Sequence, residues 1–383
     1  MRLEAKSCGA DIWPPYNDVR DAKAQYRPPK EVVMISETVA EVSLQSLLNH
    51  TVQRIVNLQE EVIHQSMSST DLTEVDVVLT CSWGFDGSTG HSAYKQRYQN
   101  EQAEAVNDES LFVTTLIPLR FSSSTGIIFW NNRTTQSARF CRPLKLEYVK
   151  ECSDVIMRQK QLIEDQINQL KIFEINLNDY RIRVLFSLLL TLIDGKVLNI
   201  ITGTKSMQTC PICHATPNKF NDLSNRLKGL FLPNPNSLQY GISPLHAWIR
   251  LLECCLHIAY RINIKKWQMR SKSDKAEFAR RKQEVQVILW EKLDLRVDKP
   301  KVGGSGTTND GNTARRAFEH PDSFADYLGL NRQLVRNFKT ILIALPANSR
   351  LILFVLTHCA HLQLRFMSLA TLGTRCLRRC IKS

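Results

Sequence analysis

Two aspartates are the residues of this chain whose types and positions could do hydrolytic chemistry. Asp194 comes at the end of a ten-residue, largely apolar run, Val184 to Ile193, and Asp86 follows the β-branched run Val75–Thr80. Carboxylates at the ends of neighbouring strands can hold two Mg²⁺ or Mn²⁺ ions about 3.5–4 Å apart, an arrangement that phosphodiester cleavage uses. The alternative is that each Asp is a turn or helix-cap residue, which is a common use of an Asp after a strand.

A Cys-Pro-Ile-Cys sequence, Cys210 to Cys213, follows Asp194 by sixteen residues. A CxxC pair is half of a tetrahedral zinc site, which needs two more thiolate or imidazole ligands. We favour zinc over redox chemistry because no thioredoxin-like Trp precedes the pair. The missing ligands could come from His358 and His361, from His246 and His257, or from His214.

A second polar patch is expected on the helix predicted over Ser243–Ile262. Glu253 and His257 are four residues apart, so they share a helix face, and His246 is close to them in the sequence. The patch could bind a second metal or do acid–base work. Its alternative is a packed helix with one polar pair.

The glycine-rich sequence Gly303–Arg316 lacks the Gly-Lys-Ser/Thr ending of a P-loop and follows no predicted strand, which disfavours nucleotide binding. It predicts a loop before a helix that starts at Thr313, with Asn312 or Thr313 as its cap. The free amides of that helix, together with Arg315 and Arg316, would contact a DNA phosphate. The alternative is a flexible linker before the helix.

The elements that must position these residues alternate between strands and helices, which predicts an α/β layered domain followed by a mainly helical region. Val32–Ser66 has helical periodicity. Val184–Ile193 reads as a fully buried strand, although a buried helix of that length has the same pattern. The other predicted strands are Val75–Thr80, Leu111–Phe121, Thr125–Trp130 and Leu144–Val149; the other predicted helices are Ser153–Phe173 and Ser273–Leu293.

Composition favours an anionic partner, because the 383 residues carry a net charge of +13. Nucleic acid is the first choice and a membrane surface the second. The start of the chain has no apolar signal-peptide core, and no uninterrupted apolar run reaches about 18 residues, so we expect no membrane insertion. Eleven scattered cysteines suggest a reducing, intracellular setting in which paired cysteines bind metal.

Five segments together resemble Transib-type transposases and the catalytic subunit of the V(D)J recombinase. They occur in the expected order between about residues 15 and 345. They are WGFDGSTGHSAYKQ, RFCRPLKLEY, LIDGKVLN with TGTKSMQTCPICHAT, SPLHAWIRLLECCLHIAYRINIKKWQ, and GGSGTTNDGNTARRAF, the last similar to an Asn-Gly-Asn-x-Ala-Arg element of the recombinase.

The resemblance implies an RNase H-like fold with an aspartate–aspartate–glutamate active site that uses Mg²⁺ or Mn²⁺. It implies cleavage of double-stranded DNA at terminal inverted repeats through hairpin-forming breaks, followed by strand transfer, in the nucleus and as a homodimer. By matching position, Asp86 and Asp194 would bind the catalytic metals. Cys210 and Cys213 would be two of four zinc ligands.

The end of the chain departs from the family, in which a paired-His zinc element and the catalytic Glu lie near the C-terminus. No Asp or Glu occurs from Tyr327 to Ser383, and His358 and His361 are three residues apart instead of five. We interpret the tail as the product of truncation or a frame shift near Leu345, typical of a decaying mobile element. DNA binding should then survive better than cleavage.

These expectations divide the chain into five parts. They are a linker or extension (1–30), a helical pre-catalytic segment (31–74), an RNase H-like core (75–205), a helical insertion with the zinc knuckle (206–345) and a divergent tail (346–383). The functional alternatives are an impaired transposase-derived enzyme and a non-catalytic, zinc-containing DNA-binding protein. A basic helical scaffold without metal is the third.

Overall fold

The computed structural model describes residues 6–9, 14–68, 73–89, 109–135, 137–177, 180–206, 209–216, 219, 234–241, 243–264, 269–300 and 306–345. The chain is of mixed α/β class and divides into two compact units, Met1–Leu189 and Leu190–Ser383. Strand β8 crosses the division. The elements before it are α2 (Tyr16–Gln25), η1 (Lys30–Val32), β1 (Val33–Ile35), β2 (Val39–Val42), α3 (Leu44–Leu58), α4 (Glu60–Ser68), β3 (Glu74–Thr89), β4 (Ser110–Ser123), β5 (Ile128–Asn131), η4 (Ala138–Phe140), β6 (Arg142–Glu147), α5 (Ser153–Asn168) and β7 (Phe173–Leu177).

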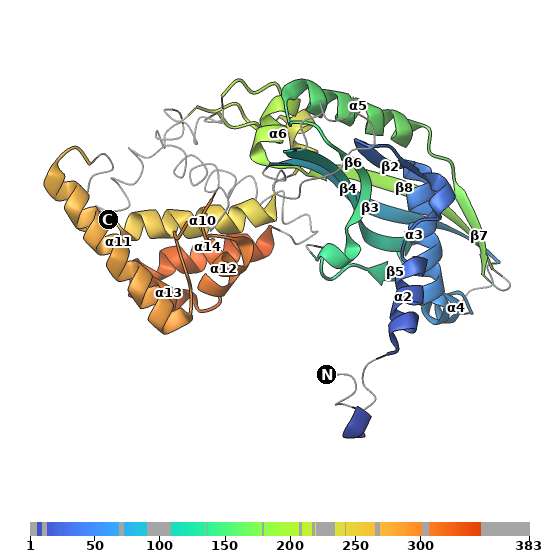
Figure 1. The fold of residues 1–383 in the computed structure, drawn as a ribbon, viewed down its shortest axis with the longest axis horizontal. Coiled ribbons are helices and arrows are strands. Elements are labelled where there is room, and N and C mark those ends of the chain that lie inside the picture. Colours follow the sequence, from blue (N-terminus) through green and yellow to red (C-terminus); the bar gives the residue numbers. More distant parts are fainter. Residues whose placement is uncertain are drawn as a thin grey trace. The chain divides into compact units, whose positions relative to one another are not determined.

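A curled sheet forms the centre of the first unit (Figure 1). Its strands follow the order β1-β2-β6-β4-β3-β8-β7, where β8 is Tyr180–Leu192, and β5 pairs with β4. The pairs β1–β2, β2–β6, β4–β6, β3–β4, β4–β5 and β7–β8 are antiparallel. The order places β3, which contains Asp86, beside β8, which leads to Asp194.

Strand β3 contains a continuous buried segment that leads to Asp86. Val75, Val77 and Leu79 alternate with partly exposed residues, as expected for a strand with one face in the core. A β-bulge follows between Thr80 and Cys81, and every residue from Cys81 to Phe85 is buried. The strand continues to Thr89, so the prediction that it ends at Thr80 is wrong and Asp86 lies within the strand.

Helices α3 and α5 contact each other, and α3 also contacts β6. The amphipathic stripe of α3 forms because apolar residues recur at spacings of three and four; its buried members are Leu44, Leu47, Leu48, Val52, Ile55 and Val56. Ser43 caps the helix by accepting a hydrogen bond from Ser46 N. The helical periodicity predicted over Val32–Ser66 therefore holds from Leu44 onwards. Before it the chain forms β1 and β2, because short β-branched runs pair along the sheet edge.

Two other predictions are wrong in part, one in a helix boundary and one in burial. The helix expected over Ser153–Phe173 ends at Asn168, and Phe173 begins β7. The expectation that Val184–Ile193 is fully buried is also wrong, since Leu185 and Leu189 are 40% and 43% exposed. A uniformly apolar strand can still leave some large side chains exposed.

The second unit is mainly helical among the described residues. Its elements are α6 (Gly195–Ile201), α9 (Pro235–Leu238), α10 (Pro244–Ala259), α11 (Lys272–Leu293), α12 (Gly311–Ala317), α13 (Pro321–Leu328) and α14 (Arg332–Ala344). Helix α10 contacts α11, α12, α13 and α14 and supplies much of one hydrophobic core. Edge-on aromatic contacts join Trp248 to Phe318 and Phe318 to Phe324 across this core.

Candidate functional site

Asp86 lies within β3, opposite Val113 of β4, and its side chain is exposed. It is the first exposed residue after the buried segment Cys81–Phe85. A carboxylate at this point is held on a rigid strand yet reaches solvent. That combination suits a ligand for a hard divalent cation.

Glu151 brings another carboxylate beside the residue that follows Asp86. Gly87 N donates a hydrogen bond of 3.2 Å to Glu151 Oε2. A Cβ at position 87 would lie 2.5 Å from the same oxygen, so only glycine fits this contact. Sequence reasoning missed Glu151, because it follows Gly87 by 64 residues and belongs to no motif.

Asp194 follows the end of β8 by two residues and is the N-cap of α6. Its Oδ1 accepts a hydrogen bond of 2.7 Å from Val197 N. The helix-cap alternative for Asp194 is therefore observed, and it leaves the metal-binding alternative open because a carboxylate has two oxygens. The pairing of Asp86 with Asp194 stays a prediction, supported by the neighbouring positions of β3 and β8.

Cys210 and Cys213 form a tight turn with their sulfurs together. Cys210 N donates to Ala215 O at 3.0 Å, and His214 N donates to Cys210 O at 2.9 Å. The turn is completed by the left-handed backbone of His214, with a φ of 53°. Cys210 Sγ accepts N–H bonds from Ile212 at 3.3 Å and Cys213 at 3.5 Å.

A hydrogen bond joins the two thiols. The Cys210 thiol donates to the Cys213 sulfur, which lowers the pKa of Cys213 to about 7 and raises the pKa of Cys210. Burial of Cys210, Ile212 and Ala215 in a small apolar cluster makes a second thiolate costly without a cation. The pair thus supplies a preformed half of a tetrahedral site, and its donor set fits zinc.

Two of the histidines proposed as further zinc ligands, His246 and His257, make local contacts. His246 Nδ1 is 2.8 Å from Ser243 Oγ, the cap of α10, and His257 is buried with its ring near Tyr260. Glu253 pairs with Arg250 at 2.8 Å. The expected polar patch is thus divided among local contacts. His358 and His361 lie outside the described residues.

Metal-ligating side chains do not gather elsewhere in the described part of the chain. Within those ranges, no group of three or more His, Cys, Asp or Glu side chains is placed to hold a metal ion. The Cys210–Cys213 pair and the single carboxylates therefore remain partial ligand sets.

Asp298, Asn309 and Asp310 hold the described residues that lead into α12. Asn309 Oδ1 accepts from Asp298 N at 2.9 Å, and its amide donates back to the Asp298 carboxylate. Asp310 caps α12 by accepting from Thr313 N at 2.9 Å. The expectation that Asn312 or Thr313 is the cap is wrong, because Asp310 takes this position and its side chain accepts from Thr313 N.

The basic residues of α12 have local partners. Arg316 Nη2 donates to Leu293 O at the end of α11, at 3.0 Å, and the Arg315 guanidinium lies 5.9 Å from the centre of the Trp248 ring. Asn312 is exposed. Arg315 and Arg316 therefore help to join helices, and contact with DNA stays a prediction for all three.

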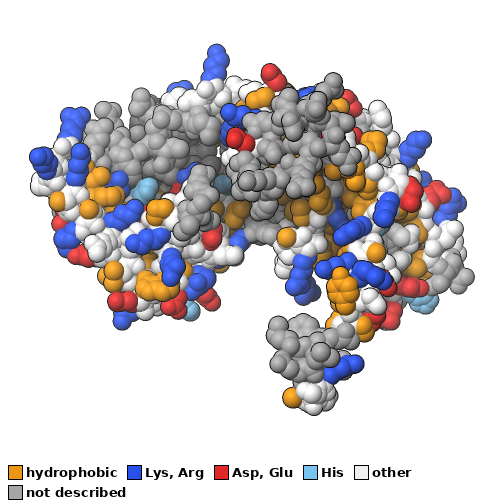
Figure 2. Space-filling model, in the orientation of Figure 1, with side chains coloured by type: hydrophobic (Ala, Val, Ile, Leu, Met, Phe, Trp, Pro, Cys, Tyr) orange, Lys and Arg blue, Asp and Glu red, His pale blue; other side chains and the backbone are white. Residues whose placement is uncertain are grey.

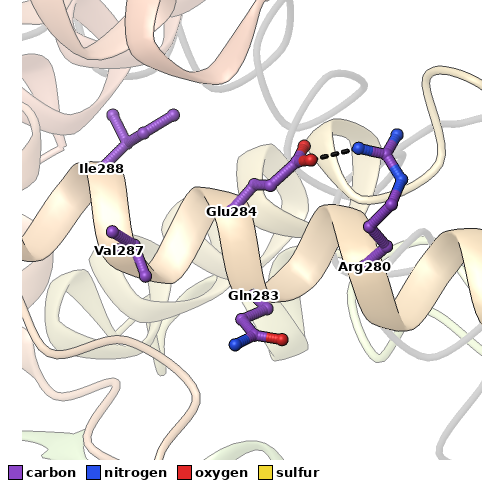
Figure 3. A pocket seen from close by; sticks show the side chains of 5 residues that line it. All are labelled: Arg280, Gln283, Glu284, Val287 and Ile288. Atoms are coloured by element: carbon purple, nitrogen blue, oxygen red, sulfur yellow. Dashed lines mark hydrogen bonds and ion pairs between the residues drawn. The ribbon is translucent and has the colours of Figure 1, made fainter.

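The surface carries mixed charge. Figure 2 shows Lys and Arg side chains spread over the face in view, with Asp and Glu among them. A shallow groove of about 340 Å³ follows one side of α11, where Arg280 pairs with Glu284 (Figure 3). Its lining comes from a single helix, so it offers no convergent polar groups. No helix in the described ranges is both long and apolar enough to span a membrane.

No model of a known protein family and no curated protein matches the chain.

Proposed function

We propose that this chain is a transposase-derived, DNA-binding protein of the aspartate–aspartate–glutamate class with an RNase H-like core. It acts on double-stranded DNA at terminal inverted repeats, in the nucleus and as a homodimer. One observation carries the proposal: β3, which contains Asp86, and β8, which ends two residues before Asp194, are neighbours in one sheet. The motif resemblance and the net charge of +13 support it.

In this function Asp86 and Asp194 hold Mg²⁺ or Mn²⁺, which supplies charge stabilisation during strand cleavage. The cap bond engages Oδ1 of Asp194, so we assign its other oxygen to the metal. Cys210 and Cys213 hold zinc as thiolates. Each of these roles uses a side chain already positioned by a strand, a helix cap or a tight turn.

Cleavage is impaired in this proposal because the sequence from Tyr327 to Ser383 contains no Asp or Glu. The loss of one well-placed electrostatic contribution costs roughly 100- to 1000-fold in rate in other enzymes. Phosphate contacts by Lys and Arg do not depend on that carboxylate. DNA binding is therefore retained while strand cleavage is weak.

Nicking of supercoiled DNA carrying terminal inverted repeats, with Mn²⁺ or Mg²⁺, tests the catalytic assignment. Asp86→Asn and Asp194→Asn should abolish residual nicking and weaken Mn²⁺ binding measured by calorimetry. Asp18→Asn, at an exposed position in α2, is the matched control. Nicking and Mn²⁺ binding that survive both substitutions would discard the assignment.

The second candidate is a non-catalytic, zinc-containing DNA-binding protein. The absence of acidic residues after Asp326 favours it. It predicts bound zinc that is lost in Cys210→Ser and Cys213→Ser, and an affinity for DNA that falls steeply with salt. Metal-dependent nicking by the wild type, absent in Asp86→Asn, would decide for the first candidate.

A further inference from the structure

Three basic side chains of the first unit lie together where α3 faces β6. His50 and Arg54 are one turn apart on α3, so they share a face, and Arg142 is the first residue of β6. Helix α3 contacts β6 directly. The chain around Tyr26, which follows α2, joins them: the Arg54 guanidinium carbon lies 3.5 Å from the centre of the Tyr26 ring, and Arg142 Nη1 donates to Tyr26 O at 3.3 Å.

These contacts hold the two guanidinium groups in place but do not satisfy them. Three nitrogens, His50 Nδ1, Arg54 Nη1 and Arg142 Nε, are buried, and none has a hydrogen-bond partner among the described residues. Buried polar atoms in proteins are nearly always hydrogen-bonded, so three in one place point to a ligand. The guanidinium groups are already oriented, because one stacks on an aromatic ring and the other is tethered to a carbonyl.

The electrostatics of this group also favour an anion. Burial lowers the pKa of Arg142, and the neighbouring charge of Arg54 lowers it further. Burial and the charges of Arg142 and Arg54 likewise lower the pKa of His50, whereas a hydrogen bond with the backbone of Gln25 raises it. Tyr26 and Cys141 are the acidic groups that raise the pKa of Arg142; the described residues contribute no carboxylate to that shift. A bound anion would relieve the repulsion between the two arginines.

We propose that His50, Arg54 and Arg142 form a binding site for a phosphate group. The donors come from a helix and a strand, and a tetrahedral oxyanion offers acceptors in several directions where a planar carboxylate offers two oxygens. Paired arginines are a common means of binding phosphate. The group could belong to a small phosphate compound or to a DNA backbone. The site uses none of the residues that are proposed to bind metal.

Thermal unfolding of the full chain in inorganic phosphate, against chloride at equal ionic strength, tests the site. Phosphate at ten times its dissociation constant should raise the folded-to-unfolded ratio about elevenfold. Arg54→Gln and Arg142→Gln should lose this effect, while Arg20→Gln, an exposed position on α2, should keep it. Arg142→Lys should lose most of it, since lysine lacks the Nε donor. Without phosphate, both Gln variants should remain folded, because each loses one contact with Tyr26 but also removes one of two repelling charges.

Binding of duplex DNA at several salt concentrations distinguishes the two sources. If the phosphate belongs to DNA, each Gln variant should lower the slope of log affinity against log salt by about 1. If the Gln variants keep the wild-type slope but are no longer stabilised by inorganic phosphate, the site is assigned to a small phosphate compound. The proposal is overturned if phosphate does not stabilise the wild type. It is also overturned if phosphate stabilises both Gln variants, or Arg142→Lys, as much as it stabilises the wild type. The nicking proposal stands independently of that result.

Discussion

Asp194 has an observed role as a helix cap and a proposed role as a metal ligand, and substitution can separate the two. The cap role depends on a side-chain oxygen that accepts from Val197 N at 2.7 Å, whereas the metal role depends on negative charge. Asp194→Asn keeps a capping oxygen and removes the charge. Asp194→Ala removes both, and Asp194→Ser keeps a cap of a different shape.

The cap bond sets the expected stabilities. Replacing an N-cap Asp by Ala costs about 1 kcal/mol, while Asn and Ser are caps of nearly equal quality. For a unit of this size, about 1 kcal/mol lowers the melting temperature by roughly 2–4 °C. Asp194→Ala should therefore melt about 2–4 °C below Asp194→Asn and Asp194→Ser, which should stay close to the wild type. Urea unfolding should show the same order, with a changed midpoint and an unchanged slope.

Mn²⁺ binding should follow charge instead of capping. All three substitutions of Asp194 remove the carboxylate, so all three should weaken Mn²⁺ binding equally. Asp310→Ala is the matched control, because Asp310 caps α12 through Thr313 N at 2.9 Å and has no proposed metal role. It should lose stability and keep Mn²⁺ binding. Equal stability of the Ala and Asn variants of Asp194 would refute the cap argument, and Mn²⁺ binding unchanged in all three would refute the metal assignment.

Two further predictions concern the cysteine pair and a glycine contact. The rate of alkylation of Cys213 in zinc-free protein should rise with pH around a midpoint near 7, because the thiolate is the reactive form and the Cys210 thiol stabilises it. Cys210→Ala should move this midpoint to higher pH. An unmoved midpoint would contradict the hydrogen bond between the two thiols. Gly87→Ala should destabilise by about 1–3 kcal/mol, because its Cβ would collide with Glu151, as measured by urea unfolding. Gly195→Ala is the control, since nothing lies within 4 Å of its added Cβ, and an equal cost for both would contradict the steric argument.

The local sequence determined much of the secondary structure. The alternation of Val75, Val77 and Leu79 predicts β3, and the apolar stripe from Leu44 to Val56 predicts α3, because side-chain periodicity is a local property. The CxxC turn is local as well, since its hydrogen bonds join residues between Cys210 and Ala215.

Tertiary structure decided what those elements bring together. The continuation of β3 past Asp86 depends on pairing with β4 as far as Thr89, which no pattern within β3 reveals. The contact of Glu151 with Gly87 depends on chain packing across 64 residues. The charges of Arg142 and Arg54 lie close enough to affect each other because β6 contacts α3. Long-range contacts of this kind arise from the burial of surfaces distant in sequence, so the acid beside Asp86 and the basic cluster could be recognised only in the folded chain.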